Sequence, residues 1–297
     1  MRLLGAGDNV VDRYVDLDVM YPGGNAVNVA VFARRAGADA AYQGVVGTDV
    51  AGRLVLDALS REGVDVSRVR VSEGPNAFAN VRVSKGERIF LDSDDGVSAV
   101  ELTASELIEL GSFDVVHTAT AGSLYHQVAD MADWTKVSFD FSRKRDREYV
   151  GAIAEHLWLG TFSTSGLSTE EAEELLRFTC ACGTRFALAS RGAQGALLFD
   201  GATLWRGGAT PVDVVDTLGA GDAYIASLLV GLLEGDPIRE AMDAAASRGA
   251  EVCAIHGAFG YPMPLAPVET DGDRKGSDHR VPTGEGSSSL VGGGGRQ

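Results

Sequence analysis

Short apolar runs alternate with segments of helical periodicity over most of the chain, and this alternation restricts the fold more than any other feature of the sequence. Beyond residue 103 the runs have the length and composition of buried strands, and they lie at 114–117, 137–140, 157–159 and 186–190. Strands of this kind, separated by helices, are typical of crossover units, whose parallel strands form one sheet that helices cover on both faces. We therefore expect an α/β fold built on a mostly parallel central sheet.

Two segments nearer the N-terminus do not fit this repeat and predict a small β lid. Residues 12–21 include an alternation of polar and apolar side chains that is typical of a half-exposed strand. Residues 76–92 contain two strand-like runs joined by a turn, which is the pattern of a hairpin. Helices are expected between these segments, over 25–35 and 50–62. The alternating pattern and the lid together predict one domain over residues 1–267.

Composition sets this domain apart from the C-terminal end and limits the partners of the protein. Residues 268–297 are rich in Gly, Ser and charge, cannot bury enough surface to offset their ordering entropy, and are predicted to be a disordered tail. The formal net charge of −16 over 297 residues repels nucleic acids and anionic membrane surfaces, so neither is expected as a partner. The three cysteines lack zinc spacing and the number of a disulfide framework, and no apolar run is long enough for a membrane span. We therefore expect a cytoplasmic protein.

A glycine-rich turn before an apolar helix carries the strongest chemical signal. Gly219, Ala220 and Gly221 precede Asp222, and an apolar run follows over 223–234. Small residues at the start of a helix leave backbone N–H groups uncovered where the helix dipole is positive, and such a site binds anions without Lys or Arg. A carboxylate beside it can take the proton of an alcohol while the N–H groups and a metal ion stabilise a transferred phosphoryl group. An Asp that only caps the helix explains the same residues, and spacing does not decide between the two.

Polar residues near the N-terminus form a second candidate site. Gly23 and Gly24 permit the backbone to approach a ligand closely. Asn25 and Asn28 lie three residues apart, so they share one helix face and can direct their side-chain amides toward the same hydroxyl groups. The alternative is that these Asn residues merely cap the helix. Upstream, Asp8 follows a strand that ends on glycines, which is where a parallel sheet places its ligands.

Both sites resemble motifs of one enzyme family. Residues 216–222 read Asp-Thr-Leu-Gly-Ala-Gly-Asp, which resembles the Asp-Thr-x-Gly-Ala-Gly-Asp signature of the PfkB, or ribokinase-like, carbohydrate kinases. Residues 23–30 resemble the Gly-Gly motif with which the family contacts sugar hydroxyls. The resemblance covers about residues 1–265 and implies a ribokinase-like three-layer α/β/α sandwich that phosphorylates a sugar hydroxyl with ATP and Mg²⁺. It also implies that Asp222 is the catalytic base and that 219–221 form the anion hole.

The same resemblance implies contacts to the sugar and the nucleotide. The family's sugar-binding Asp ends a Gly-x-x-x-x-Asp run that matches Gly7 to Asp12, so Asp12 is the first choice for a clamp on vicinal hydroxyls and Asp8 is the second. Residues 189–195 resemble the turn beneath ATP, and 246–257 are expected to close the adenine pocket. The implied nucleotide contacts are Ser190, Gly192, Gly195, Thr217, Gly219 and Gly221.

The chain departs from the family pattern in its metal site. Many members carry Asn-x-x-Glu after the strand that corresponds to 157–159, whereas this chain has Ser-Thr-Ser-Gly at 163–166. Magnesium must then be organised by the phosphates of ATP, by water and by Asp216. The resemblance leaves open whether a monovalent cation such as K⁺ is also required. The sequence contains no Gly-x-x-x-x-Gly-Lys-Ser/Thr loop, so a P-loop mechanism is disfavoured.

Several segments resemble the fructoselysine 6-kinases in particular. They include residues 7–12, 90–97, 113–117, 139–142 and 255–259. A fructosamine carries a protonated amine, and the predicted lid supplies Asp92, Asp94 and Asp95 together, so a mouth lined by these carboxylates would attract the amine and repel a sugar phosphate. A solvated acidic turn is the alternative reading of these three residues.

Other functions stay open at this point. A related kinase for another sugar or a nucleoside (ribose, fructose or a keto-sugar acid) would carry the same motifs. A non-catalytic sugar- or nucleotide-binding protein on this scaffold would not need Asp222, which the chain keeps. A dinucleotide-binding dehydrogenase is disfavoured because Val10 stands where its fingerprint requires a third glycine. A homodimer formed through the lid is a further expectation, because exposed strand edges seek cover.

Overall fold

The computed structural model describes residues 1–84 and 87–265. The predicted tail at 268–297 and the predicted hairpin turn at 85–86 lie outside these ranges. Met1–Leu265 form one unit with its own core.

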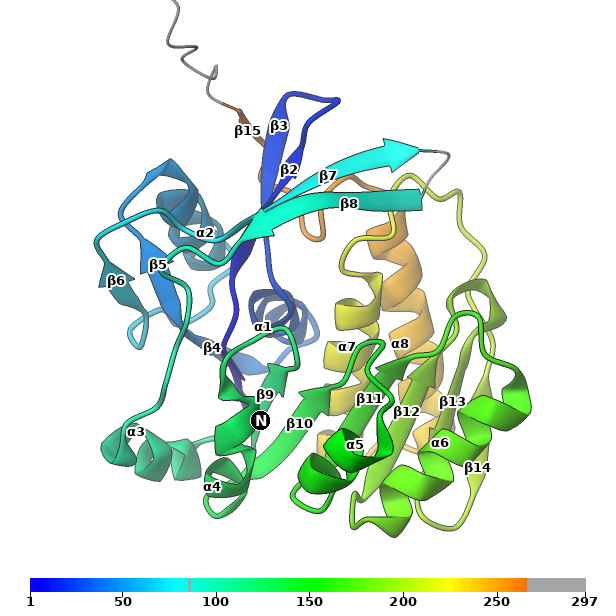
Figure 1. The fold of residues 1–297 in the computed structure, drawn as a ribbon. Coiled ribbons are helices and arrows are strands. Elements are labelled where there is room, and N and C mark those ends of the chain that lie inside the picture. Colours follow the sequence, from blue (N-terminus) through cyan, green and yellow to red (C-terminus); the bar gives the residue numbers. More distant parts are fainter. Residues whose placement is uncertain (85–86, 266–297) are drawn as a thin grey trace, which may run out of the picture. The chain divides into compact units, whose positions relative to one another are not determined.

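A central sheet of eight strands runs through the described residues (Figure 1). Its strands are parallel except at one edge, where β13 and β14 run antiparallel to their neighbours. In spatial order the strands are β14 (Leu204–Gly207), β13 (Ala196–Phe199), β12 (Phe186–Ser190), β11 (Leu159–Ser163), β10 (Lys136–Asp140), β9 (Val115–Ala119), β1 (Arg2–Ala6) and β4 (Asp39–Gln43). The expected α/β class with a mostly parallel sheet is confirmed.

Helices cover both faces of the sheet and complete the three layers that the resemblance implied (Figure 1). Successive residues of a strand point to opposite faces, so Leu3 packs in the core under one helix layer and Leu4 in the core under the other. One layer contains α1 (Asn25–Arg35), α7 (Ala220–Glu234) and α8 (Ile238–Cys253). The other contains α4 (Val128–Ala132), α5 (Arg147–Ala154) and α6 (Thr169–Ala181). Short 3₁₀ turns are η1 (Leu110–Ser112), η2 (Leu124–Gln127) and η3 (Gly192–Gln194).

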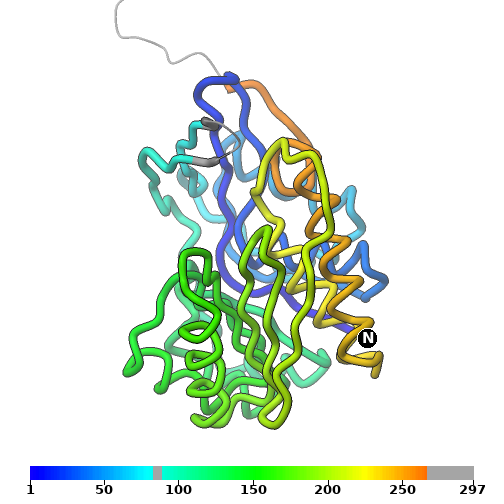
Figure 2. The backbone as a smooth tube through the Cα atoms, turned by 90° about the vertical axis from the view of Figure 1, so that its right-hand side faces the viewer, coloured from blue at the N-terminus to red at the C-terminus, as the bar shows by residue number. Residues whose placement is uncertain are grey.

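The lid is a second sheet that combines both ends of the described chain. In spatial order it contains β15 (Met263–Pro264), β3 (Val19–Gly23), β2 (Val10–Tyr14), β7 (Phe78–Ser84) and β8 (Glu87–Asp94). Figure 2 shows the blue N-terminal hairpin and the orange last described segment side by side, in agreement with the pairing of β15 with β3. α2 (Val50–Arg61) packs against β2 and β3.

Strand register assigns each lid side chain to one of two faces. Tyr14 and Phe90 occupy equivalent positions along the sheet, and the Tyr14 hydroxyl contacts the loop before α7, so we call their face the inner face. Arg13, Asn80 and Asp92 form the adjacent row. Because neighbouring residues of a strand point to opposite sides, this row lies on the outer face.

Some details near the N-terminus differ from the sequence-based expectation. The single strand expected at 12–21 is a hairpin, because the chain turns at 15–18, where Asp18 has a φ of 51°. In addition, β5 (Val45–Gly47) and β6 (Arg70–Ser72) form a short sheet of their own. The edge of the central sheet is formed by β4. This strand was not predicted, because its first and last residues are polar. The predicted helix at 25–35 is confirmed.

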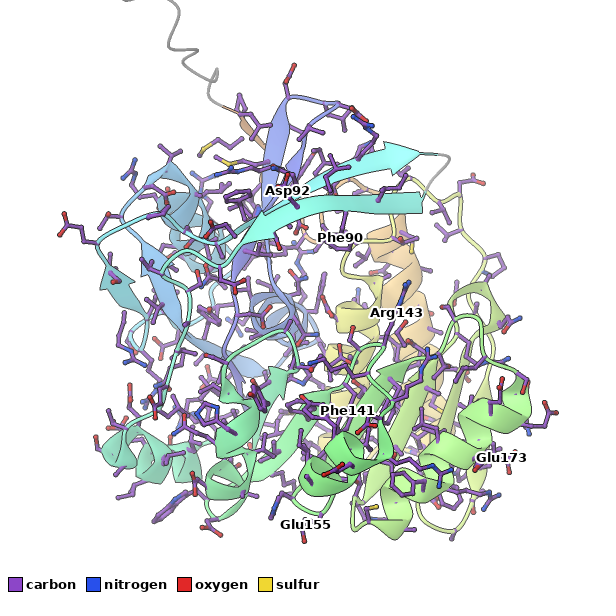
Figure 3. The ribbon with its side chains drawn as sticks, in the orientation of Figure 1. Phe90, Asp92, Phe141, Arg143, Glu155 and Glu173 are labelled. Atoms are coloured by element: carbon purple, nitrogen blue, oxygen red, sulfur yellow. The ribbon has the colours of Figure 1, made fainter. Side chains whose placement is uncertain are left out.

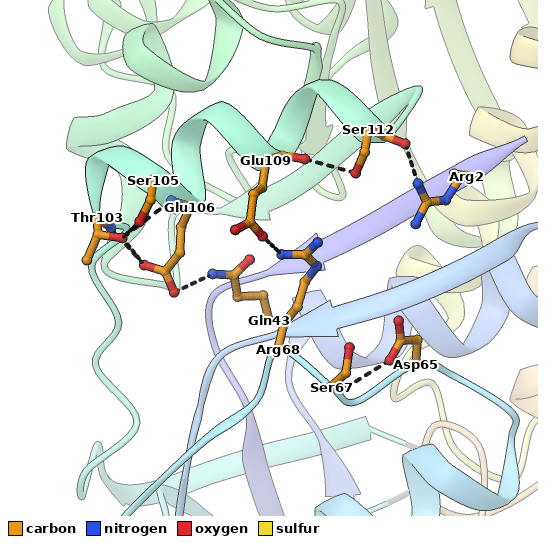
Figure 4. Close-up of polar contacts among 10 residues, drawn as sticks. All are labelled: Arg2, Gln43, Asp65, Ser67, Arg68, Thr103, Ser105, Glu106, Glu109 and Ser112. Carbon is orange, nitrogen blue, oxygen red and sulfur yellow. Dashed lines mark hydrogen bonds and ion pairs between the residues drawn. The ribbon is translucent and has the colours of Figure 1, made fainter.

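Polar contacts fix the segment after the lid to the edge of the central sheet (Figure 4). α3 (Ala104–Glu109) begins at Thr103, which forms a capping box with Glu106. The Glu106 carboxylate also accepts a hydrogen bond from the Gln43 amide at the end of β4 (2.9 Å). Arg2, at the start of β1, donates to a backbone carbonyl that follows α3 (2.7 Å). The chain therefore returns from the lid to the sheet at a fixed position.

Candidate active site

The candidate site lies where the order of the central strands reverses. From β1 the chain continues to β4 on one side and later to β9 on the other, so the connections after β1 and β9 leave in opposite directions. In open α/β sheets this point creates a crevice outside the carboxyl ends of the strands, and ligands bind there. Asp8 follows β1, His117 is the middle residue of β9, and Asp140 is the last residue of β10.

Asp8 is fixed at the N-terminus of α1. Its carboxylate accepts hydrogen bonds from the backbone N–H groups of Asn25 (2.8 Å) and Ala26 (3.3 Å). Burial raises the pKa of the Asp8 carboxyl, and these N–H groups oppose the shift. Gly24 precedes the helix with a φ of 105°, and a Cβ there would lie 2.7 Å from Cα of Asn9, so only glycine allows α1 to start at this position.

Asp222 is held between the two asparagines predicted at the site. Its carboxylate oxygens accept one hydrogen bond from the Asn25 amide (2.9 Å) and one from the Asn28 amide (2.6 Å). Burial raises the pKa of Asp222 to about 7; the charges of Asp140 and Asp8 add to this effect, and the two amides oppose it. A half-buried carboxyl group with a pKa near neutrality has the properties of a general base at physiological pH.

Asp140 belongs to the same cluster, although its role was not predicted from the sequence. It accepts hydrogen bonds from the Asn25 amide (3.2 Å), the Thr161 hydroxyl (2.8 Å) and the Ser142 backbone N–H (3.0 Å). Burial raises the pKa of Asp140, as does the nearby charge of Asp8. Its position as a polar residue at the end of an apolar strand was the signal that the sequence offered.

The predicted anion site is at the start of α7, which begins three residues earlier than the apolar run suggested. Gly219 caps the helix with a φ of 76°, and a Cβ there would lie 2.4 Å from Cβ of Ala258. Gly221 differs, because no atom lies within 4 Å of the place where its Cβ would be. The first N–H groups of an α-helix have no partner within the helix. Open space over Gly221 therefore leaves this end of α7 accessible to an anion, one residue from Asp222.

Asp216, the predicted metal ligand, is engaged by the protein itself. It is 2% exposed, and its carboxylate accepts hydrogen bonds from the Tyr14 hydroxyl, the Gly257 backbone N–H (3.1 Å) and the Leu218 backbone N–H (3.0 Å). These contacts tie the loop before α7 to the inner face of the lid. Residues 1–84 and 87–265 contain no group of three or more His, Cys, Asp or Glu side chains arranged to hold a metal ion.

The remaining sugar contacts predicted from the sequence lie on the lid side of the crevice. Asp12 is 3% exposed on β2, on the same face as Tyr14. A Cβ on Gly23 would lie 2.6 Å from a carboxylate oxygen of Asp12, so the glycine makes room for this carboxylate. Asp8, the second choice, contacts the first turn of α1 directly.

The structure corrects the expected position of the lid carboxylates. Asp92 lies on the outer face, where the Asn80 amide donates to it (2.5 Å), and Asp94 accepts the backbone N–H of Gly96 (2.8 Å). Figure 3 shows Asp92 and Phe90 on opposite sides of β8, with Phe90 toward the central sheet. These acids therefore do not line the mouth of the site. Alternation alone would place Phe90 and Asp92 on one face, but the register shift between Asn80 and Val81 places them on opposite faces.

The predicted nucleotide turn follows β12 at the same edge of the sheet. The Ser190 hydroxyl donates to the Phe162 carbonyl (3.2 Å), and η3 follows with Gly192 (φ 56°) and Gly195 (φ 82°). A Cβ on Gly195 would lie 2.1 Å from the Gly207 carbonyl oxygen, so this glycine is required by packing. Thr217 is exposed.

The strand end that lacks Asn-x-x-Glu carries a guanidinium group instead. Arg145 donates to the carbonyl of Ser163, the last residue of β11 (2.7 Å). In Figure 3, Arg143 projects from the same loop toward the lid. Neither arginine was predicted from the sequence, because both lie in a loop that only the fold brings to this edge.

Comparison with known proteins agrees with this geometry. A family model described as pfkB family carbohydrate kinase matches residues 7–264. Fructosamine kinase FrlD of Bacillus subtilis (strain 168) is 36% identical over 269 residues, which cover 89% of this chain and 95% of that protein. Fructoselysine 6-kinase of Escherichia coli (strain K12) is 33% identical, over 85% of this chain and 97% of that protein. The structure of Arabidopsis thaliana ribokinase complexed with ribose and ATP is 20% identical and has a TM-score of 0.72, covering 87% of this chain and 94% of that one.

Among residues 1–84 and 87–265, no helix combines the length and the apolar character needed to cross a membrane.

Proposed function

This chain belongs to the pfkB family of carbohydrate kinases and is a phosphotransferase with an alcohol acceptor, and from that premise we propose that its substrate is a fructosamine such as fructoselysine, phosphorylated on the 6-hydroxyl. Two relatives support this choice, since a fructosamine kinase and a fructoselysine 6-kinase match most of the chain at 36% and 33% identity. The proposal goes beyond the family, whose other members act on different sugars.

The charge of the site supports an amine-bearing substrate. Asp8, Asp140 and Asp222 converge around Asn25, and burial raises the pKa of each carboxyl group. A protonated amine would stabilise the charged forms of these groups, whereas the phosphate of a sugar phosphate would be repelled. These three carboxylates, and not the acids of the lid, would therefore attract the amine. Their convergence is the single observation that carries the proposed substrate.

The proposed reaction uses Asp222 as general base. The carboxylate accepts the proton of the sugar hydroxyl while the hydroxyl oxygen bonds to the γ-phosphorus of ATP and the bond to the β-phosphate oxygen breaks, which yields the phosphorylated sugar and ADP. The N–H groups at the start of α7 stabilise the charge on the transferred group. Asn25 and Asn28 hold the base in place, and Asp8 and Asp12 are the proposed sugar contacts, beside Gly23 and Gly24.

The residues of the site do not offer a set of ligands for a resident magnesium ion. Asp216 is already hydrogen-bonded through both carboxylate oxygens, so it positions the loop and does not fit the role of a direct ligand. We propose that Mg²⁺ arrives on the phosphates of ATP. The nucleotide contacts proposed for this chain stay Ser190, Gly192, Gly195, Thr217, Gly219 and Gly221, with 246–257 around the adenine.

The proposed function also includes an oligomeric state and a cellular compartment. A second copy of this chain is the proposed partner at the lid, because β8 is an edge strand and exposes Ile89, Phe90 and Leu91. We place the enzyme in the cytoplasm, where ATP is available.

A substrate screen tests the proposed function. The purified chain would be incubated with Mg-ATP and, separately, fructoselysine, fructose, ribose, a nucleoside and a keto-sugar acid, while ADP release and the site of phosphorylation are measured. We expect the highest kcat/KM with fructoselysine and a 6-phosphate product. Higher kcat/KM with a neutral sugar would replace the substrate but keep the kinase. Sugar binding without ADP release from any substrate would point to a non-catalytic binding protein.

A further inference from the structure

A buried histidine contacts Asn25, the asparagine that hydrogen-bonds to the proposed base. His117 lies on β9, is 0% exposed, and contacts the Asn25 carbonyl oxygen through Nε2 (2.8 Å) and the Ser138 hydroxyl through Nδ1 (2.9 Å). The Asn25 amide nitrogen in turn contacts Asp222 and Asp140. A continuous chain of hydrogen bonds therefore runs from the interior of the sheet to the base.

The chemistry of this chain fixes its direction. Two carboxylates accept from the Asn25 amide nitrogen, so its carbonyl oxygen must accept from His117, and Nε2 must carry the proton. Nδ1 then accepts from the Ser138 hydroxyl. Burial lowers the pKa of His117 to about 3, so the ring is neutral at physiological pH and has one tautomer.

The backbone around His117 is shaped for this contact. On one side its register partner is Gly5 of β1, and on the other it is Ser138 of β10. A Cβ on Gly5 would lie 2.2 Å from the Ala26 carbonyl oxygen. Glycine at this position therefore lets the first turn of α1 rest on β1, which brings Asn25 within reach of the imidazole.

We propose that His117 is a positioning residue for phosphoryl transfer, which orients the Asn25 side chain so that its N–H group, and not its carbonyl oxygen, faces Asp222. This inference rests on the proposed role of Asp222 as the base. Without the imidazole donor, the Asn25 carbonyl oxygen is left without its hydrogen bond, and the side chain can shift from the geometry in which its N–H group faces both carboxylates. A base displaced from its productive geometry transfers the proton more slowly even though every substrate contact is retained.

Kinetics of two substitutions at position 117 test the proposal. His117→Leu removes the donor, and we expect kcat to fall by about tenfold or more while KM for ATP stays within about twofold, because the nucleotide turn is not touched. His117→Gln keeps an N–H donor at a similar distance from the backbone and should restore most of kcat. Equal kcat losses for both variants, or no loss for His117→Leu, would overturn the proposal.

The pH profile gives a readout that a general loss of stability would not move. The groups that face Asp222 are Asp8, Asp140, Asn25 and Asn28, and the Asn25 hydrogen bond lowers the pKa of Asp222. Loss of this bond in His117→Leu should move the acid limb of kcat to higher pH. An unchanged limb together with a reduced kcat would contradict a role through Asn25.

A double-variant cycle separates action through Asn25 from action elsewhere. If His117 acts only through this residue, His117→Leu should reduce kcat by less than about twofold in the Asn25→Ala background. An effect as large as in the parent chain would overturn the proposal. If His117→Leu does not fold, the double variant His117→Leu/Ser138→Ala, which removes the hydroxyl left unpaired, serves in its place.

A spectroscopic measurement keeps this inference independent of the proposed substrate. Nitrogen NMR of the ¹⁵N-histidine-labelled chain should show that the His117 ring is neutral, is protonated on Nε2 and does not titrate between about pH 5 and 8. Protonation on Nδ1, or titration in this range, would contradict the hydrogen-bond chain even if the kinase acts on fructosamines. The expected tautomer without fructosamine turnover would leave the positioning role intact and remove only the proposed substrate.

Discussion

At the level of single residues, the site is a cluster of carboxylates whose ionisation is controlled by hydrogen bonds from other segments of the chain. Asp222 is bracketed by Asn25 and Asn28, and Asp140 shares the Asn25 amide. Each carboxylate raises the cost of ionising the others, whereas each amide lowers it. The balance leaves Asp222 with a pKa of about 7, which suits a base that must accept a proton at neutral pH.

Removal of the base carboxylate should abolish turnover selectively. For Asp222→Ala we expect kcat to fall by about two orders of magnitude or more, the scale associated with loss of a general base. ATP affinity, measured by calorimetry, should change little, because the start of α7 and the turn after β12 keep their backbone. A kcat within about threefold of the parent would exclude Asp222 as the base.

Neutralisation of a neighbour should shift the pH dependence. The charge of Asp140 raises the pKa of Asp222, so Asp140→Asn should lower it, and the acid limb of kcat/KM should move to lower pH. The limb moves in this direction because a base with a lower pKa stays deprotonated in more acidic solution. Asp130→Asn, an exposed substitution on α4, is the control and should leave the limb unchanged. A shift to higher pH would contradict the arrangement.

At the scale of elements, the start of α7 uses its two glycines for different purposes. Gly219 has a left-handed conformation and packs against Ala258, whereas Gly221 faces open space. We therefore expect the first glycine to be needed for folding, and we propose that the second leaves room for the ligand. The loop before them is anchored by Asp216 to the lid and to Gly257, so the anion site is held from two sides.

A pair of substitutions separates these purposes. Gly219→Ala should lower the free energy of unfolding by about 1–3 kcal/mol, because its φ of 76° and the Ala258 contact leave no room for a Cβ. Gly221→Val should leave the thermal midpoint nearly unchanged and reduce kcat strongly, because its side chain fills the space intended for a phosphate. Thermal unfolding and kinetics of both variants decide the matter; a destabilised Gly221→Val with normal kcat would reverse the assignment.

At the level of the whole molecule, the lid sheet contains strands from both ends of the described chain. It also has an exposed edge strand, β8. β8 is the last strand of the lid sheet, and Ile89 on its outer face is 48% exposed. Charged side chains on an edge strand prevent it from pairing with another copy. The edge of the lid is therefore the place where we expect a second copy to pack.

A charge placed on this edge should weaken the proposed dimer. Ile89→Lys is expected to shift the protein toward the monomer in sedimentation velocity at matched concentration, because Lys cannot be buried against a second lid without loss of hydration. Leu17→Lys, at the exposed turn between β2 and β3, is the matched control and should have no such effect. A parent chain that is already monomeric at the highest concentration would reject the lid dimer.

Features that depend on neighbouring residues could be predicted from the amino-acid sequence. The Gly-Ala-Gly-Asp turn, the helix at 25–35 and the alternation of strands and helices depend on neighbouring residues. The α/β class could therefore be predicted correctly from the sequence, and the anion site and the base candidate could be proposed from it. The family-like motifs named the same residues that the fold brings together, although Asn25 and Asp222 are 197 positions apart.

Which side chains meet depends on the three-dimensional fold. Asp140 and His117 join the site through strand register. Asp92 turns away from it because a register shift between β7 and β8 places it on the face opposite to Phe90. Asp216 is available as a metal ligand by its sequence, but it is occupied in the fold by donors from the lid and from Gly257. Such contacts depend on register and packing across distant segments, which no local pattern encodes.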